Sequence, residues 1–387
     1  MFRYLPLIVK NCWRNRRRTT LTIVSIGVSM CLLGVLIAVY HALYLSDATP
    51  DQALRVVTRN RISLTIPIPL FYRDRIRQIP GVKEIMSSQW FNGVYKDARD
   101  PNNFFARFGV DPPEKLFTIF GELKIPEDQK QAFIRDRTGT VIGRDLANKF
   151  HFHVGDRITI IGDIYPGNLE LTVRGIFDSP RQSEVLYFHW AYVREGLAES
   201  RKGEVGTFDI LCDNAGVVPR VAKTIDDGFH NAPVQTRTET EQAFLLTFVG
   251  MLGNVKLFLI SICAAVMFTI LLVSGNTMAM SVRERVREVG VLKTLGFTGG
   301  NILFIILGEA CAISIAGGVI GFLLSTFLVG GVQKSPAGMF LPPIQRFDPS
   351  VASACILVAL GIGMVSSFIP AWNASRTNIV EALRSTD

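Results

Sequence analysis

Few residues of this 387-residue chain have the type and spacing that chemistry requires. His151 and His153 form an H-x-H pair, and the alternation of a strand would place both rings on one face, as a metal site needs. Because no third ligand stands at a matching spacing, packed or exposed histidines are the preferred interpretation and a metal site is the alternative. No serine lies in a nucleophile-elbow motif. The sequence therefore predicts no catalytic residue and no bound metal.

The charged segment at residues 280–297 is the most informative part of the sequence. Val282, Val286 and Val289 recur at helical spacing, and charges of both signs surround the other face. This pattern predicts an amphipathic helix that continues a preceding apolar segment, ends at Gly296 and then turns into the next apolar segment. A short helix of this kind suits the docking of a partner, and a solvated charged loop is the alternative.

Polar and small residues inside the apolar segments are the next candidates. Glu309 is the one acid within the third of these segments. We expect it near the membrane interface in a structural or coupling contact. The alternatives are a pair with a basic residue near the cytoplasmic face and a proton relay. Gly317 and Gly321 have G-x-x-x-G spacing, which permits close helix approach either within the chain or at a dimer seam.

Long apolar segments must position these residues. The chain is 48% hydrophobic and only 19% charged, whereas a soluble protein carries about 25% charged residues. Four runs reach the length of about 20 apolar residues that a membrane-spanning helix needs. The first is too long for the apolar part of a cleavable signal, so we expect it to be retained. The predicted spans are residues 20–45, 251–280, 302–332 and 351–372.

The distribution of basic residues predicts the topology. Arginine and lysine concentrate in residues 1–19 and 281–301 and recur in the tail at 373–387, which places these three segments in the cytoplasm. The short loop at 333–350 and the long segment at 46–250 then lie on the opposite side. The net charge of +8 is thus a topology signal, and we expect no nucleic-acid partner.

The long segment between the first two spans is large enough for a folded domain with its own core. Short helices and strands alternate in it, which predicts an α+β domain of two lobes, with an inserted lobe at about 112–200. Examples are a strand over 56–66 and a helix over 127–135. Cys212 is its single cysteine, so the domain must be stable without an internal disulfide. The predicted fold class is an α-helical membrane protein with four transmembrane helices and this extracytoplasmic domain inserted between helices 1 and 2.

Five sequence stretches, taken together, resemble the MacB/FtsX/LolC-E-type (type VII) ABC transporter permeases. The central one, between the second and third spans, is RERVREVGVLKTLGFT. The other four are similar to the family's basic entry into helix 1 (residues 11–30), its periplasmic core domain (140–180), its third helix from Glu309, and its fourth-helix exit and tail (369–387). The ordered set covers nearly the whole chain.

The resemblance implies a multi-pass protein of the bacterial inner membrane with both termini in the cytoplasm. Two permease chains, identical or paralogous, would stand above two copies of an ABC ATPase, which would bind the ATP and Mg. A periplasmic adaptor and an outer-membrane protein are possible further partners, besides membrane lipids. MacB carries a fused ATPase domain, whereas this chain has no G-x-x-x-x-G-K-[ST] motif. We therefore expect a separate ATPase and no cofactor on this chain.

In such permeases the loop after helix 2 would take up motion of the ATPase and pass it outward, a mechanism called mechanotransmission. The resemblance places the ATPase-coupling contacts on Arg283, Glu284, Arg287, Glu288, Val291, Leu292, Leu295 and Gly296.

Three function classes follow from the sequence. The first is an ABC permease that exports or extracts macrolide-like compounds, peptides, lipids or lipoproteins from the periplasm or outer leaflet. The second is an FtsX-like regulator of an extracytoplasmic cell-wall hydrolase, which the size of the outer domain disfavours. The third is a membrane enzyme or passive receptor, for which the sequence offers no acid–base pair, nucleophile or metal site.

Overall fold

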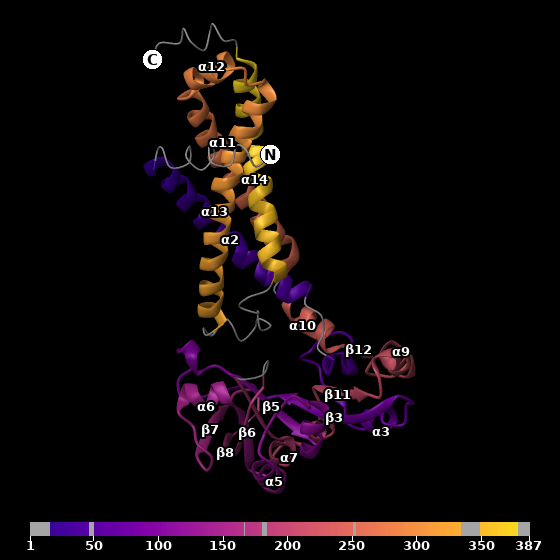
Figure 1. Ribbon diagram of the computed structural model, residues 1–387. Coiled ribbons are helices and arrows are strands. Elements are labelled where there is room, and N and C mark those ends of the chain that lie inside the picture. The colour runs from indigo at the N-terminus through magenta and orange to yellow at the C-terminus, as the bar shows by residue number, and fades with distance from the viewer. Residues whose placement is uncertain are drawn as a thin grey trace. The chain divides into compact units, whose positions relative to one another are not determined.

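The computed structural model describes residues 16–45, 50–165, 167–179, 184–250, 253–333 and 349–377. The chain divides into two compact units (Figure 1). We call residues 1–46 and 254–387 the membrane unit, and Asp47–Gly253 the large domain. The predicted N-terminal segment, most of the 333–350 loop and most of the tail lie outside the described residues.

The membrane unit contains the four predicted spans as long helices. They are α2 (Arg16–Tyr44), α11 (Val255–Arg283), α13 (Gly299–Gln333) and α14 (Pro349–Arg376). Each is long and apolar enough to cross a membrane. Large side chains such as Phe327 (80% exposed) and Leu21 (71%) point away from the helix bundle, as lipid-facing residues do. The third helix begins three residues before its expected start because Thr298 caps it: its hydroxyl oxygen accepts from the Asn301 amide at 3.3 Å.

Small residues bring α13 against both α2 and α14. A Cβ atom on Gly321 would lie 2.6 Å from the Cβ of Met30 and 2.7 Å from the carbonyl oxygen of Gly27. A Cβ on Gly317 would lie 2.6 Å from Ile26. Of the two alternatives for the G-x-x-x-G spacing, the structure shows packing within the chain, against α2.

A mixed ten-stranded sheet forms the large domain (Figure 1). Its spatial order is β12-β1-β11-β3-β5-β9-β6-β8-β7-β4, in which β5–β9 and β6–β8 are parallel pairs. A two-stranded sheet of β2 (Ile68–Pro69) and β10 (Glu204–Val205) accompanies it. The ten strands are β1 (Arg55–Asn60), β3 (Val82–Trp90), β4 (Gly93–Val94), β5 (Ala106–Asp111), β6 (Gly139–Gly143), β7 (Arg157–Gly162), β8 (Asn168–Phe177), β9 (Val185–His189), β11 (Thr207–Cys212) and β12 (Thr236–Thr240).

Short helices flank this sheet. They are α3 (Tyr72–Ile76), α4 (Leu116–Ile119), α5 (Glu127–Arg135), α6 (Arg144–Phe150), α7 (Trp190–Arg194), α8 (Glu199–Lys202), α9 (Val218–Gly228) and α10 (Glu241–Gly250). The helix expected over 127–135 is thus confirmed as α5. The strand expected over 56–66 ends at Asn60, because the Asn60 side chain accepts a hydrogen bond from the Ile62 amide at 2.9 Å and turns the chain.

Alternating side chains of the strands build one apolar cluster on each face of the sheet. Leu186 and Phe188 of β9 belong to one cluster, and Tyr187 between them belongs to the other. The expected inserted lobe contributes β6 to β9 to this same sheet, so residues from both predicted lobes share each cluster. Together the helices and the domain confirm the predicted four-helix membrane protein with a large α+β domain between helices 1 and 2.

Three arginines of the large domain are almost completely buried: Arg55, Arg59 and Arg107. Arg55, 2% exposed, lies between two carboxylates, with Nη2 2.6 Å from Glu122 and Nε 2.5 Å from Glu241. Burial alone would lower the pKa of Arg55, but the hydrogen bonds and attraction of these two carboxylates raise it. Arg107, 1% exposed, has no carboxylate partner among the described residues and donates instead to the carbonyl oxygen of Gly93 at 2.9 Å. Burial lowers the pKa of Arg107 to about 10.

Candidate coupling site

The predicted amphipathic helix is a separate element, α12 (Val286–Thr294). The prediction of one helix continuing from the second span was wrong, because α11 ends at Arg283 and the chain turns at Glu284 and Arg285. The predicted end is confirmed. Gly296 has φ +88° and, with Phe297, donates back to the carbonyl oxygens of Lys293 and Leu292, which is the Schellman arrangement that favours glycine.

The break in the helix gives the segment two distinct faces. Val291 (46% exposed) and Leu295 (71%) follow Arg287 at four-residue spacing and form an exposed stripe. Glu288 and Leu292 lie on the inner face and line a cavity. The exposed members of the predicted coupling set are Arg283, Glu284, Arg287, Val291, Leu295 and Gly296.

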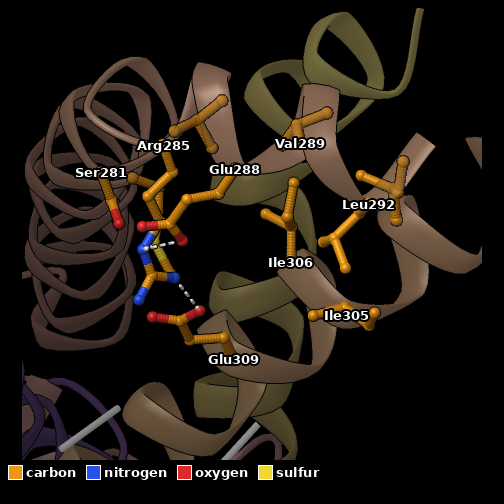
Figure 2. A pocket seen from close by; sticks show the side chains of 11 residues that line it. Ser281, Arg285, Glu288, Val289, Leu292, Ile305, Ile306 and Glu309 are labelled. Carbon is orange, nitrogen blue, oxygen red and sulfur yellow. Dashed lines mark hydrogen bonds and ion pairs between the residues drawn. The ribbon is translucent and has the colours of Figure 1, made fainter. Parts of the chain in front are cut away.

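The cavity on the inner face lies between α11, α12 and α13 (Figure 2). Its volume, counted as space open to the centres of water molecules, is about 40 Å³. This is room for water, since a single buried water needs at least about 10–15 Å³ by that measure. Apolar side chains form most of its wall, and polar groups gather at one end. The lining residues are Met278, Ser281, Val282, Arg285, Glu288, Val289, Leu292, Ile302, Ile305, Ile306 and Glu309.

An ion pair occupies the polar end of the cavity. Arg285 Nη1 donates to a carboxylate oxygen of Glu309 at 2.6 Å, and Arg285 Nε lies 4.0 Å from the Glu288 carboxylate (Figure 2). Glu309, on α13, is only 5% exposed. An unpaired charge would be costly there, so the guanidinium offsets the burial of the carboxylate.

Sequence reasoning offered a basic residue near the cytoplasmic face as one possible partner of Glu309, but it did not identify Arg285 as that residue. A signal was available, because an acid inside an apolar helix requires a nearby cation. The assumption of an unbroken helix hid it, since only the turn at 284–285 directs Arg285 inward.

Further contacts fix α12 to the two helices beyond it. Lys293 Nζ donates to the carbonyl oxygen of Thr377, one residue past α14, at 2.5 Å. Val289, on the inner face of α12, is 5% exposed and lines the cavity. A displacement of α12 would therefore act on α13 through Glu309 and on the end of α14 through Lys293.

The histidine pair does not lie on a strand but between α6 and β7, so the expected strand alternation was wrong. His151 ends α6 in the left-handed conformation, with φ 57°, and the His153 side chain is 82% exposed. His189 is buried, its Nε2 lies 2.7 Å from the Phe133 carbonyl oxygen, and burial lowers its pKa. Over the described ranges, no three potential ligands come together in a metal-binding group.

Fold and site define a multi-pass membrane protein with one large inserted domain and a short helix tied to its third and fourth spans. The family model described as the MacB-like periplasmic core domain matches residues 19–227, and the FtsX-like permease C-terminal model matches residues 258–379. The chain belongs to the MacB/FtsX-type ABC transporter permeases. A membrane subunit of this family works with an ATPase and a second permease chain.

Two curated relatives and one solved structure are similar to this chain. An uncharacterized ABC transporter permease of Methanocaldococcus jannaschii is 21% identical over 396 aligned residues, which cover 97% of this chain and 96% of the relative. The macrolide export ATP-binding/permease protein MacB of Sodalis glossinidius is 41% identical over 110 residues, covering 28% of this chain and 16% of that protein. Among solved structures, the periplasmic region of MacB from Actinobacillus actinomycetemcomitans covers 50% of this chain and 92% of its own, with 14% identity and a TM-score of 0.36.

Proposed function

We propose that this chain is a permease subunit that couples ATP hydrolysis by a separate ABC ATPase to movement of its large domain. The observation that carries the proposal is the exposed stripe of Arg287, Val291 and Leu295 on α12. Apolar side chains flanked by charges on a short exposed helix suit a protein partner. The opposite face of the same helix is tied to α13 and α14, so binding on the stripe would act on two spans.

The positive-inside distribution supports the orientation of this assembly in a bacterial inner membrane. Basic residues at 14–18 and 283–293 favour the cytoplasmic side for the N-terminal segment, α12 and the tail. The large domain is then periplasmic. Two copies of the ATPase would bind ATP and Mg beneath two permease chains.

We further propose that the substrate is exported or extracted from the periplasm or the outer leaflet by mechanotransmission. Glu309 is the one acid within the four spans, and Arg285 neutralises it. A row of ionisable groups, which marks a polar path through a membrane, is not present in the sequence of these spans. Transmission of motion to a periplasmic domain requires no such path.

The test compares α12 with a matched apolar surface. The chain would be co-expressed with the ABC ATPase encoded beside its gene, and ATP turnover and ATPase retention would be measured in nanodiscs. The variant V291D/L295D should weaken retention by at least about tenfold, because apolar side chains at the centre of an interface carry most of its energy.

The control variant, I62D/F71D, introduces two aspartates at apolar side chains of the large domain that are 85% and 61% exposed. It should retain and stimulate the ATPase as the unaltered protein does. Equal retention by both variants, or no association of the unaltered chain under any nucleotide condition, would contradict the proposed function.

A further inference from the structure

We infer that Arg285 is the positioning residue that passes movement of α12 to α13, by shifting between the carboxylates of Glu309 and Glu288. The inference rests on the proposed function, because it takes the ATPase as the source of the movement. It adds a mechanism inside the permease that docking on the exposed stripe does not require.

The position of Arg285 in the chain supports this role. It is the last residue before α12, with φ −112° and ψ 10°, and lies outside both α11 and α12. A side chain at such a turn changes direction when the two helices change their angle. Its planar guanidinium presents donors on two sides, so it can address two carboxylates without leaving the cavity.

Figure 2 shows the Arg285 head group between the two acids. The Glu309 contact is a direct hydrogen bond of 2.6 Å to the neighbouring helix α13. Glu288 lies 4.0 Å from Arg285 Nε, beyond hydrogen-bond distance, on α12 itself. A small rotation of α12 would therefore replace the Arg285–Glu309 bond, which joins two helices, with an Arg285–Glu288 bond inside the α12 segment. This would release α13.

Burial makes the two partners unequal. The Glu309 side chain is 6% exposed and the Glu288 side chain 39%. Solvent stabilises the charge of the Glu288 carboxylate when Arg285 is bound to Glu309. The buried Glu309 carboxylate instead needs the guanidinium to offset its charge. The pair with Glu309 is therefore the resting state, and work done on α12 is needed to open it. The adjoining cavity of about 40 Å³ can admit water to Glu309 while the pair is open.

Three variants in complex with the ATPase test this inference: Glu309→Gln, Arg285→Gln and Glu288→Gln. Two quantities would be measured in nanodiscs besides ATPase retention. One is the stimulation of ATP turnover. The other is the nucleotide-dependent change in hydrogen–deuterium exchange of the large domain, which a residue with only a structural role would leave intact.

We expect Glu309→Gln and Arg285→Gln to retain the ATPase, because the exposed stripe is unchanged. Both should reduce the nucleotide-dependent change in hydrogen–deuterium exchange of the large domain by about fivefold or more. This is the lower end of the factors to which typical coupling free energies between two sites correspond. A double variant that combines Glu309→Gln with Arg285→Gln should be no worse than either single variant, because both substitutions remove the same contact. Glu288→Gln should weaken the response while leaving the melting temperature unchanged.

The outcomes separate the inference from the proposed function. If the unaltered chain fails to retain the ATPase, the proposed function fails. If Glu309→Gln retains the ATPase and shows the full nucleotide-dependent change in hydrogen–deuterium exchange of the large domain, the inference alone fails. A normal response in Glu288→Gln would overturn the shift between carboxylates. Additive losses in the double variant would overturn the direct link between Arg285 and Glu309.

Discussion

The large domain and the membrane unit stabilise their buried charged side chains in different ways. In the large domain, Arg55 is held by Glu122 and Glu241, and Arg59 is held by Glu239, all within or beside a continuous sheet. In the described part of the membrane unit, the buried carboxylate of Glu309 is held across a break between helices, next to a cavity. An ion pair inside a continuous sheet stabilises a single arrangement of its elements. An ion pair at a break between helices, beside a cavity with room for water, can exist in two arrangements.

The two regions also differ in how they pack. Large aromatic side chains such as Phe188, Trp190 and Phe208 fill one face of the sheet. In the membrane unit, Gly317 and Gly321 bring backbones together instead. Burial of apolar area stabilises a domain in water, but lipid tails are as apolar as leucine, so helix association in a membrane depends on close contact.

The largest effect is expected from removing the central cation of the large domain. Arg55→Met leaves the partly buried carboxylates of Glu122 and Glu241 with no cation between them. It should reduce the free energy of unfolding of the domain by about 3 kcal/mol. Native-state hydrogen exchange of the β1 and β11 amides would measure it. The matched control is Arg107→Met, which is equally buried but has no carboxylate partner among the described residues. It should change the free energy of unfolding by no more than about 1 kcal/mol, and equal losses would contradict the role assigned to the carboxylates.

A smaller effect is expected in the membrane unit from Gly321→Leu. The new side chain would meet the Gly27 carbonyl oxygen and the Cys31 amide nitrogen, whose backbone atoms cannot move aside without separating α2 from α13. We expect a loss of about 1–3 kcal/mol, measured as a lower melting temperature in detergent. Gly331→Leu on the same helix is the control, since a Cβ atom at that position would meet nothing within 4 Å. Similar melting temperatures for the two variants would show that α13 does not pack on α2 in this way.

The smallest effect concerns pH and the large domain. Burial raises the pKa of Asp209 from 3.8 to about 6, against an opposing hydrogen bond from Ser88, while the nearby Glu241 raises it further and Arg55 lowers it. The folded state therefore holds the proton more tightly than the unfolded state. The resulting stability is fully present below about pH 4 and is lost as pH rises through 6.

Relative to the Asp209→Asn variant, the unaltered domain should lose about 1–2 kcal/mol between pH 4 and pH 7. Unfolding of both proteins at a series of pH values would measure this difference. A difference that stays constant with pH, or that grows in the opposite direction, would contradict the raised pKa.

The sequence was sufficient for features that depend on local residues. The four spans follow from runs of about 20 apolar residues, and the end of α12 follows from Gly296, whose φ of +88° suits glycine. Features that depend on distant contacts were not predictable. Periodicity gave no sign that β5 pairs with β9. Nor did it show that Arg285 turns toward Glu309, 24 residues further on, because that depends on a helix break.

The most direct test of the central claim is photo-crosslinking in membranes. A benzophenone amino acid would replace Leu295 on α12 or, for comparison, Phe71 in the large domain; both positions are exposed. Our account predicts that the ABC ATPase is crosslinked from position 295 and not from position 71. An ATPase that co-purifies with the chain but is crosslinked from position 71, or from neither position, would contradict it.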